Sequence, residues 1–260
     1  MPQAVAITRA VSPALGACEL THVARVPIDV ELARAQHRAY EQALIDAGYR
    51  VERLDTGPDM PDSVFVEDIA VVFDELAIIT RPGAESRRRE TPAVAEALAA
   101  YRPLHVIQPP GTVDGGDVLV AGRRVFVGRS LRTHDPAIAQ MRQLLGPRGY
   151  TVCDTEVRGC LHLKSAATAL DDDLLLVNRD WIDRAAFGGF TLVDVDPEEP
   201  AAANALRLAD RIMVSASFPR TADCLRRRGL QLAIVEASEV AKAEGAVTCC
   251  SLIVGHVDSR

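Results

Sequence analysis

The sequence has no hydrophobic run long enough to cross a membrane and no segment that resembles a secretion signal. A transmembrane helix needs about 20 consecutive apolar residues. The N-terminal stretch MPQAVAITRA lacks the basic and then apolar order of a signal peptide. We therefore predict a cytoplasmic protein with no membrane association.

Cysteines are few, with six scattered over 260 residues. A secreted domain held together by disulfides has a much denser cysteine framework, so free thiols are expected here. Two of the six, Cys249 and Cys250, are adjacent in the sequence. This pair lacks the C-x-x-C spacing that lets two thiolates bind one metal ion.

Dense basic clusters are also rare. One such cluster, SRRRE at residues 86–90, has no aromatic residues interleaved with it, unlike the basic surfaces that bind single-stranded nucleic acid. The formal net charge is −7 and the isoelectric point is near 5.4. We therefore expect no nucleic-acid partner, and the acidic balance weakly favours a cationic ligand.

What the sequence does contain is an alternation of short strand-like runs with longer Ala-rich helical ones. Helices are predicted over residues 29–48, 91–101 and 135–149, with Asp29, Thr91 and Asp135 as their N-caps. Strands are predicted over residues 4–8, 49–54, 69–73, 76–80, 104–107, 117–121, 124–128, 150–155, 173–178, 191–195, 211–216, 232–237 and 248–254.

The order of these elements repeats. A hairpin, a helix and a further strand recur after about 47 residues, a spacing typical of supersecondary repeats. Four such ββαβ units follow one another, and a fifth is split between the two termini, so that strand 248–254 pairs with strand 4–8. This pairing closes a ring and removes exposed sheet edges. The prediction is an α/β fold of five ββαβ units around a central channel, with residues 1–260 as one domain.

Polar residues that break the apolar pattern fall just before the predicted hairpins. In a ring these stretches converge on the central channel, and they cover residues 62–68, 112–117, 159–165 and 247–251. The pair Glu67 and Asp68 is the most informative. Two carboxylates in a run destined for burial cost several kcal/mol unless a positive group meets them. A cationic substrate would provide that group.

Each remaining candidate also has a purely structural interpretation. In a strand only one of Cys249 and Cys250 can face a pocket, and a buried apolar cysteine is the commoner case. His162 lies between two leucines, where a histidine is more often a core or surface residue than a base. The segment from Asp114 to Asp117, DGGD, can be a turn.

Six blocks nevertheless occur together, in the order PDSVFVED, ITRPGAESRR, TVDGGDVL, GRSLRT, LHLKS and TCCSLIV. In order and spacing they resemble the dimethylarginine dimethylaminohydrolases of the guanidino-group-modifying (pentein) superfamily. The resemblance runs over nearly the whole chain. It implies a five-bladed α/β propeller with pseudo-fivefold symmetry. It also implies a hydrolase that converts Nω-methylated arginines to citrulline and a methylamine without a cofactor.

The resemblance also implies roles for individual residues. Cys249 is the nucleophile that forms a covalent S-alkylthiouronium intermediate, His162 is the general acid and base, and Asp114 orients His162. Asp68 binds the substituted guanidinium. Asp62 and Glu67 bind the amino-acid end of the substrate, and Arg87 and Arg132 bind its α-carboxylate. Phe65 forms an apolar wall, and Leu20 belongs to a lid.

Other interpretations remain open. An arginine or agmatine deiminase would use the same cysteine, histidine and carboxylates, and a non-catalytic protein that binds cationic amino acids would need only the carboxylates. Zinc could bind Cys249, His162 and an aspartate, but in this family we expect it to inhibit, so no catalytic metal is predicted. The predicted partner is a methylated arginine, and the sequence allows a homodimer without requiring one.

Overall fold

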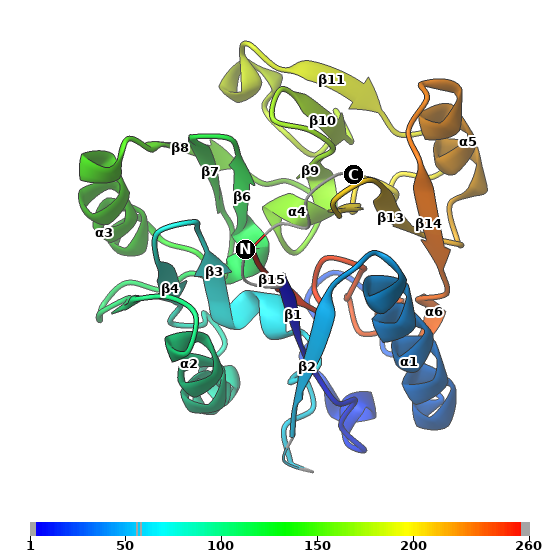
Figure 1. The fold of residues 1–260 in the computed structure, drawn as a ribbon, viewed down its shortest axis with the longest axis horizontal. Helices are drawn as coiled ribbons and strands as arrows, with labels where there is room; N and C mark the ends of the chain where they lie inside the picture. The colour runs from blue at the N-terminus through cyan, green and yellow to red at the C-terminus, as the bar shows by residue number, and fades with distance from the viewer. Residues whose placement is uncertain (1–3, 56, 58, 256–260) are drawn as a thin grey trace.

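The computed structural model describes residues 4–55, 57 and 59–255. Within these residues the strands form five small sheets of three strands each, arranged around a common centre (Figure 1). The strand orders are β15-β1-β2, β3-β4-β5, β6-β7-β8, β9-β10-β11 and β12-β13-β14. The predicted ring of five units is therefore confirmed for this part of the chain.

The elements follow the predicted order closely. The strands are β1 Val5–Arg9, β2 Arg50–Leu54, β3 Ala70–Val72, β4 Ala77–Ile79, β5 Leu104–Val106, β6 Val118–Ala121, β7 Arg124–Arg129, β8 Thr151–Glu156, β9 Ala167–Ala169, β10 Leu174–Val177, β11 Thr191–Asp194, β12 Leu206–Arg207, β13 Ile212–Ser215, β14 Leu232–Val235 and β15 Leu252–Val254. The α-helices are α1 Val30–Asp46, α2 Thr91–Ala99, α3 Asp135–Leu145, α4 Leu163–Ala166, α5 Pro219–Arg227 and α6 Ser238–Ala241. Short 3-10 helices are η1 Leu15–Ala17, η2 Val66–Ile69, η3 Glu85–Glu90, η4 Gly115–Asp117, η5 Gly146–Arg148 and η6 Arg184–Phe187.

Every sheet has the same pattern of pairing. Its first strand is antiparallel to the second, and its second strand is parallel to the third. The parallel pairs are connected through a helix, because a parallel connection must return to the starting edge of the sheet. In the sheet β9-β10-β11 this connection contains only the short helix η6.

The fifth unit is split between the termini, as predicted. Val5 of β1 lies opposite Val254 of β15 in an antiparallel pair, and β1 then runs parallel to β2 after helix α1. The longer helices α1, α2, α3 and α5 lie at the periphery of the ring in Figure 1. Apolar side chains fill the space between neighbouring units, so the core is divided into several clusters rather than one.

Helix caps were predicted with mixed success. Asp29 caps α1, because its carboxylate accepts a hydrogen bond from the Leu32 amide at 3.0 Å. The other two predictions were wrong. The Thr91 hydroxyl donates back to the Arg88 carbonyl, where η3 runs directly into α2, and Asp135 lies inside α3 and pairs with Arg129.

The strand predicted at residues 248–254 was too long. Strand β15 begins only at Leu252, and Cys249 and Cys250 lie in the turn before it. The backbone there bonds elsewhere: the Thr248 amide donates to the Asn204 side chain and the Cys249 amide to the Ala246 carbonyl. Strand alternation therefore does not explain how the two cysteines differ.

The predicted convergence at the ring centre is present. Helices η2 and η4 contact each other, and α4 contacts η4. Each of these short helices directly precedes the first strand of a sheet, so the polar residues collect where the sheets meet.

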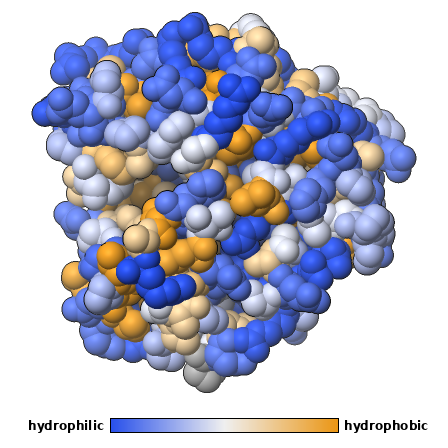
Figure 2. All heavy atoms as spheres, turned by 180° about the vertical axis from the view of Figure 1, so that it is seen from behind, coloured by the Kyte–Doolittle hydropathy of each residue, from blue (hydrophilic) through white to orange (hydrophobic). Residues whose placement is uncertain are grey.

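The face of the molecule in Figure 2 is mostly polar. In Figure 2 hydrophilic residues cover most of the visible face, and hydrophobic residues form separate small groups. Among the described residues, no helix has both the length and the apolar character needed to span a bilayer.

Candidate active site

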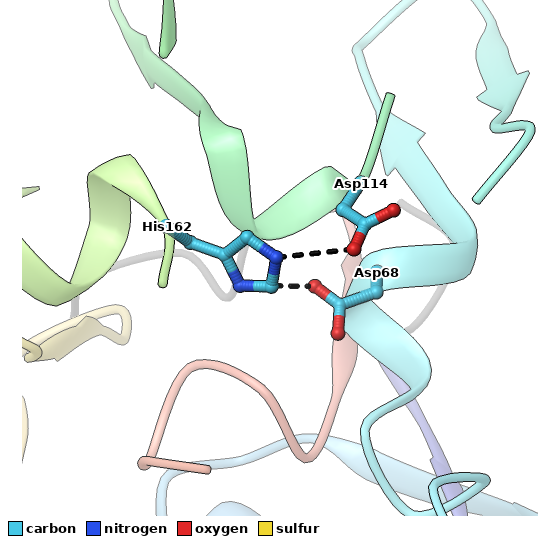
Figure 3. A group of neighbouring side chains, drawn as sticks. All are labelled: Asp68, Asp114 and His162. Atoms are coloured by element: carbon cyan, nitrogen blue, oxygen red, sulfur yellow. Dashed lines mark hydrogen bonds and ion pairs between the residues drawn. The ribbon is translucent and has the colours of Figure 1, made fainter. Parts of the chain in front are cut away.

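His162 lies between two buried carboxylates at the centre of the ring (Figure 3). Its Nε2 atom is 3.1 Å from Asp114 Oδ2, and its Nδ1 atom is 3.7 Å from Asp68 Oδ1. Burial of the ring opposes its positive charge, but Asp68, Asp117 and Asp114 outweigh burial and raise the pKa of His162 to about 9. The histidine is therefore an imidazolium at neutral pH and can donate a proton.

The two glycines of the DGGD block allow His162 and Asp68 to lie close to the backbone of this block. A Cβ atom at Gly116 would lie 2.5 Å from His162 Nδ1 and 2.8 Å from Asp68 Oδ1, and one at Gly115 would lie 2.0 Å from the Glu67 carbonyl oxygen. The Gly116 amide also donates to Asp68 at 3.0 Å. The block is therefore more than a turn, because its backbone packs directly against the site.

Asp117, the last residue of the block, holds the backbone that follows His162. Its carboxylate accepts hydrogen bonds from Ser130 Oγ at 2.6 Å, Thr133 Oγ1 at 2.7 Å and the Leu163 amide at 2.9 Å. Burial raises the pKa of Asp117 to about 6 despite these donors and His162. Since Leu163 follows His162 directly, Asp117 holds the start of α4 in place.

Cys249 lines the same cavity as His162, Asp68 and Asp114, and 9% of its surface is exposed. Burial, followed by the neighbouring carboxylates of Glu67 and Asp68, raises the pKa of this thiol well above its usual value. Cys249 is therefore a thiol rather than a thiolate at neutral pH. A cation that entered the cavity would lower the pKa of the Cys249 thiol.

Two arginines and a third aspartate also line the cavity. Arg87 is buried, and its guanidinium pairs with Asp68 at 2.5 Å and with Glu90 at 3.0 Å. Arg132 is half-buried at the other side of the cavity, and its Nη2 atom contacts Thr21 Oγ1 at 3.2 Å. Burial raises the pKa of Asp62 to about 6, although Arg87 opposes this shift.

Residues 19–23, called the lid segment here, include Leu20 of the predicted lid, and Glu19 of this segment lines the cavity. The Glu244 carboxylate accepts the backbone amides of Thr21 at 2.7 Å, His22 at 2.5 Å and Val23 at 3.0 Å. The Glu19 amide donates to Asp62 at 3.2 Å. The cavity has a volume of about 20 Å³, which is room for about one water.

The residues that could hold a metal ion are not those of the zinc site considered above. Among the described residues, one group of ligand atoms lies within 4.8 Å of one another, and it consists of Asp68, Asp114 and His162. Cys249 is outside this group. In these three side chains the two carboxylates pair with the His162 imidazolium. This pairing explains their close spacing without a metal ion.

Comparisons with known proteins agree with this geometry. A family model described as N,N dimethylarginine dimethylhydrolase, eukaryotic, matches residues 24–243. The chain is 42% identical to the N(G),N(G)-dimethylarginine dimethylaminohydrolase of Streptomyces coelicolor, over 97% of both chains. The chain belongs to the dimethylarginine dimethylaminohydrolase family.

Solved structures place this family member in the same fold. A Pseudomonas aeruginosa dimethylarginine dimethylaminohydrolase, a cysteine-to-serine mutant complexed with citrulline, superposes with a TM-score of 0.92 at 32% identity. The match covers 97% of this chain and 100% of that one. The N-terminal domain of ArgZ, a cyanobacterial arginine dihydrolase, covers 98% of both chains with a TM-score of 0.88. At 17% identity it shows only the shared fold.

The structure brings most of the predicted residues of this dimethylarginine dimethylaminohydrolase family member to one cavity. Eight of them line it: Asp62, Phe65, Asp68, Arg87, Asp114, Arg132, His162 and Cys249. Two do not. Glu67 points to Lys164 and Thr248, and Leu20 packs on the apolar cluster beside the cavity.

Five further residues line the cavity without having been predicted, namely Glu19, Leu161, Ala243, Glu244 and Gly245. Glu19 and Leu161 are sequence neighbours of predicted residues, which is the signal that could have found them. Ala243 and Gly245 carry no chemical group to mark them. Gly245 is required by packing, since a Cβ atom there would lie 2.1 Å from the Phe65 ring.

Proposed function

We propose that this protein hydrolyses Nω-methylated arginines, asymmetric dimethylarginine and monomethylarginine, to citrulline and a methylamine in a single catalytic domain. The observation that carries the proposal is the content of one cavity. It contains the Cys249 thiol, a protonated His162 and the carboxylates of Asp68 and Asp114. Membership of the family supports the choice of substrate.

Binding of the guanidinium depends on Asp68 and Asp114. Asp68 accepts hydrogen bonds from Arg87 and the Gly116 amide, and Asp114 from His162 and the Gly83 amide. A carboxylate offers about four acceptor positions, so each can also accept from the substrate. Charge-assisted hydrogen bonds of this kind would hold the planar cation rigidly.

The nucleophile becomes reactive when the cation binds. The positive charge of the substrate beside Cys249 offsets Glu67 and Asp68, lowers the pKa of the thiol and releases its proton to solvent. The thiolate then attacks the guanidino carbon. A delocalised guanidinium is a weak electrophile, which is why a strong nucleophile in a fixed position is needed.

His162 transfers protons in both halves of the reaction. It donates its proton to the departing methylamine as the C–N bond breaks, which leaves an S-alkylthiouronium on Cys249 and a neutral imidazole. The imidazole then takes a proton from water, which restores the imidazolium that Asp68 and Asp114 favour, and the resulting hydroxide adds to the thiouronium carbon. The C–S bond breaks, and the hydroxyl proton passes to the departing thiolate, which releases citrulline and restores the Cys249 thiol.

The amino-acid end of the substrate is assigned to the mouth of the cavity. Arg132 and Arg87 bind the α-carboxylate. Arg132 has more donors available for it, because Arg87 already pairs with Asp68 and Glu90. The Asp62 carboxylate accepts hydrogen bonds from the α-amino group with the same oxygens that accept a hydrogen bond from the Glu19 amide. Phe65 forms the apolar wall, and Leu20 belongs to the lid segment.

The test is citrulline production by the purified protein, without added metal. Asymmetric dimethylarginine, monomethylarginine, symmetric dimethylarginine, arginine and agmatine are assayed in parallel. We expect turnover of the first two and little from arginine or agmatine. Preferred turnover of arginine or agmatine would assign a deiminase instead, and binding of methylarginine without any turnover would assign a binding protein.

A further inference from the structure

Four buried or half-buried polar side chains form a closed hydrogen-bonded ring next to the cavity. Lys164 Nζ donates to Glu67 Oε1 at 2.5 Å, and Thr248 Oγ1 donates to Glu67 Oε2 at 2.7 Å. Asn204 Nδ2 donates to Thr248 Oγ1 at 2.9 Å and to the Lys164 carbonyl at 3.0 Å. The Thr248 amide donates back to Asn204 Oδ1 at 3.0 Å.

Three members of this ring are neighbours of reactive residues in the sequence. Glu67 precedes Asp68, Lys164 is two residues after His162, and Thr248 precedes Cys249. Asn204 is the exception, because it comes from the segment before β12 and has no such neighbour. The four residues precede the first strands of four different sheets, so this hydrogen-bonded ring joins four of the five units.

The side-chain amide of Asn204 uses both of its N–H donors and accepts one hydrogen bond. Both contacts of its nitrogen and the one of its oxygen join α4, which follows His162, to the turn that carries Cys249. The side chain is 5% exposed, so water cannot readily replace these bonds. An aspartate has the same shape but no N–H donor, so it could not make the bonds to Lys164 and Thr248.

The direction of the hydrogen bonds also depends on Asn204. A hydroxyl has one hydrogen, and because the Asn204 amide donates to Thr248 Oγ1, that hydrogen is directed to Glu67. The Glu67 amide in turn donates to the Cys249 carbonyl at 3.1 Å. Without the Asn204 donor the hydroxyl is free to rotate away, which leaves the Glu67 charge less compensated beside the thiol.

We propose that Asn204 is a positioning residue for the hydrolysis proposed above: it fixes the turn of Cys249 against the helix that follows His162 and keeps Thr248 directed to Glu67. The inference rests on that proposed function for its kinetic readout. A second readout, alkylation of Cys249 by iodoacetamide as a function of pH, does not depend on any substrate.

The charged and titratable groups around Cys249 must be considered in that second readout. They are Glu67 and Asp68 of η2, Cys250 in the same turn, Tyr40 of α1, and His162, Asp114, Asp62, Glu19, Glu244, Arg87 and Arg132 around the cavity. Of these groups, only Glu67 loses a hydrogen bond directly when Asn204 is replaced, because the Thr248 hydroxyl that donates to Glu67 is oriented by Asn204. A change in Asn204 should therefore raise the pH at which alkylation reaches half its maximal rate.

The experiment compares Asn204→Asp with Asn178→Asp. Asn178 is a matched control, since it is 6% exposed and its side chain also bonds backbone groups, donating to the Pro200 carbonyl at 2.9 Å and accepting from the Asp180 amide. It does not line the cavity. Both variants place a carboxylate in a buried polar site, and their melting temperatures measure the structural cost alone.

For Asn204→Asp we expect kcat for asymmetric dimethylarginine to fall about 10- to 100-fold with little change in KM, because a small displacement of reacting groups is enough for this. The midpoint of Cys249 alkylation should rise by about one pH unit. Asn178→Asp should change neither. Equal effects of the two variants on kcat and alkylation, at matched loss of melting temperature, would overturn the proposal.

Thr248→Val is a second variant, used in particular if Asn204→Asp does not fold. It removes the hydroxyl that links Asn204 to Glu67 and keeps the shape of the side chain. We expect the same upward shift of the alkylation midpoint, and an unchanged midpoint contradicts the proposal. If the wild-type protein produces no citrulline from any methylarginine, the proposed function fails, while the alkylation comparison still tests Asn204.

Discussion

At the scale of single residues, the environment of Cys249 opposes its own ionisation. Two carboxylates next to a buried thiol favour the neutral form, and the adjacent Cys250 has its pKa raised to about 12, by burial first and then by Glu67 and Asp68. Such an arrangement protects the thiol from oxidation while the cavity is empty, because the thiolate is the reactive species. In the proposed mechanism the same carboxylates attract the cationic substrate that activates the thiol.

Replacing Cys249 with serine separates chemistry from binding. We expect Cys249→Ser to lose citrulline production entirely, since a serine hydroxyl is a far weaker nucleophile than a thiolate. Binding of asymmetric dimethylarginine, measured by calorimetry, should remain within a few fold of wild type, because the carboxylates are untouched. Cys250→Ser is the control, and turnover by Cys249→Ser would refute the mechanism.

The charge of Asp114 sets the alkaline limit of activity. In the proposed mechanism His162 must be protonated to release the amine, so kcat at saturating substrate, where the bound cation has lowered the pKa of Cys249, should fall on the alkaline side as His162, whose pKa is raised to about 9, loses its proton. Asp114 favours the imidazolium. In Asp114→Asn the pKa of His162 should therefore drop, by about one unit, and the alkaline limb should move to lower pH. An unmoved limb would show that Asp114 does not control this proton.

At the scale of elements, Glu244 makes the most hydrogen bonds to the lid segment. Glu244 adopts a positive φ of 58°, which is unfavourable for a residue other than glycine. In return its carboxylate caps three consecutive amides of residues 21–23. Asp62 and Arg132 also contact the lid segment, so the residues proposed to bind the amino-acid end of the substrate also hold this segment.

Loss of the Glu244 carboxylate should open the lid. In Glu244→Ala we expect hydrogen exchange of the amides of residues 21–23 to accelerate about tenfold or more, because a hydrogen bond to a charged group contributes about 1.5–3 kcal/mol. Glu198→Ala is the control, since Glu198 is exposed and pairs with Arg220 on another part of the ring. Equal exchange in wild type and Glu244→Ala would exclude this role.

At the scale of the whole molecule, the ring is stable only when it is closed. A sheet of three short strands is marginal by itself, so each unit relies on its neighbours. Closure depends on β15, which pairs with β1 and places Leu252 and Val254 in a cluster with Val66 and Ile69 of η2. The terminal strand therefore secures both the ring and the helix that carries Asp68.

A cavity in β15 should weaken the entire molecule. Leu252 is 4% exposed, and Leu252→Ala should lower the free energy of unfolding by about 2–5 kcal/mol. Ile234, which is 42% exposed in β14, is the control, and Ile234→Ala should cost about 0.5 kcal/mol or less. Thermal unfolding followed by circular dichroism measures both. Equal losses in the two variants would show that β15 is not essential for closure.

The sequence by itself determined the order of the elements, the split fifth unit and eight of the residues that line the cavity. Such features depend on local patterns: alternation in strands, glycine and proline at turns, and polar residues that interrupt apolar runs. Each can be interpreted within a window of a few residues. The motif blocks then supplied the chemistry, because their order and spacing are specific to one family.

Only the tertiary structure decided which way several of these side chains face. Glu67 turns to Lys164, 97 residues away, and Thr248 bonds Asn204, 44 residues away. These two contacts remove Glu67 from the cavity lining and bend the Cys249 segment into a turn instead of a strand. No local pattern encodes them, because a hydrogen bond between distant segments exists only once the apolar packing of several units has brought its donor and acceptor together.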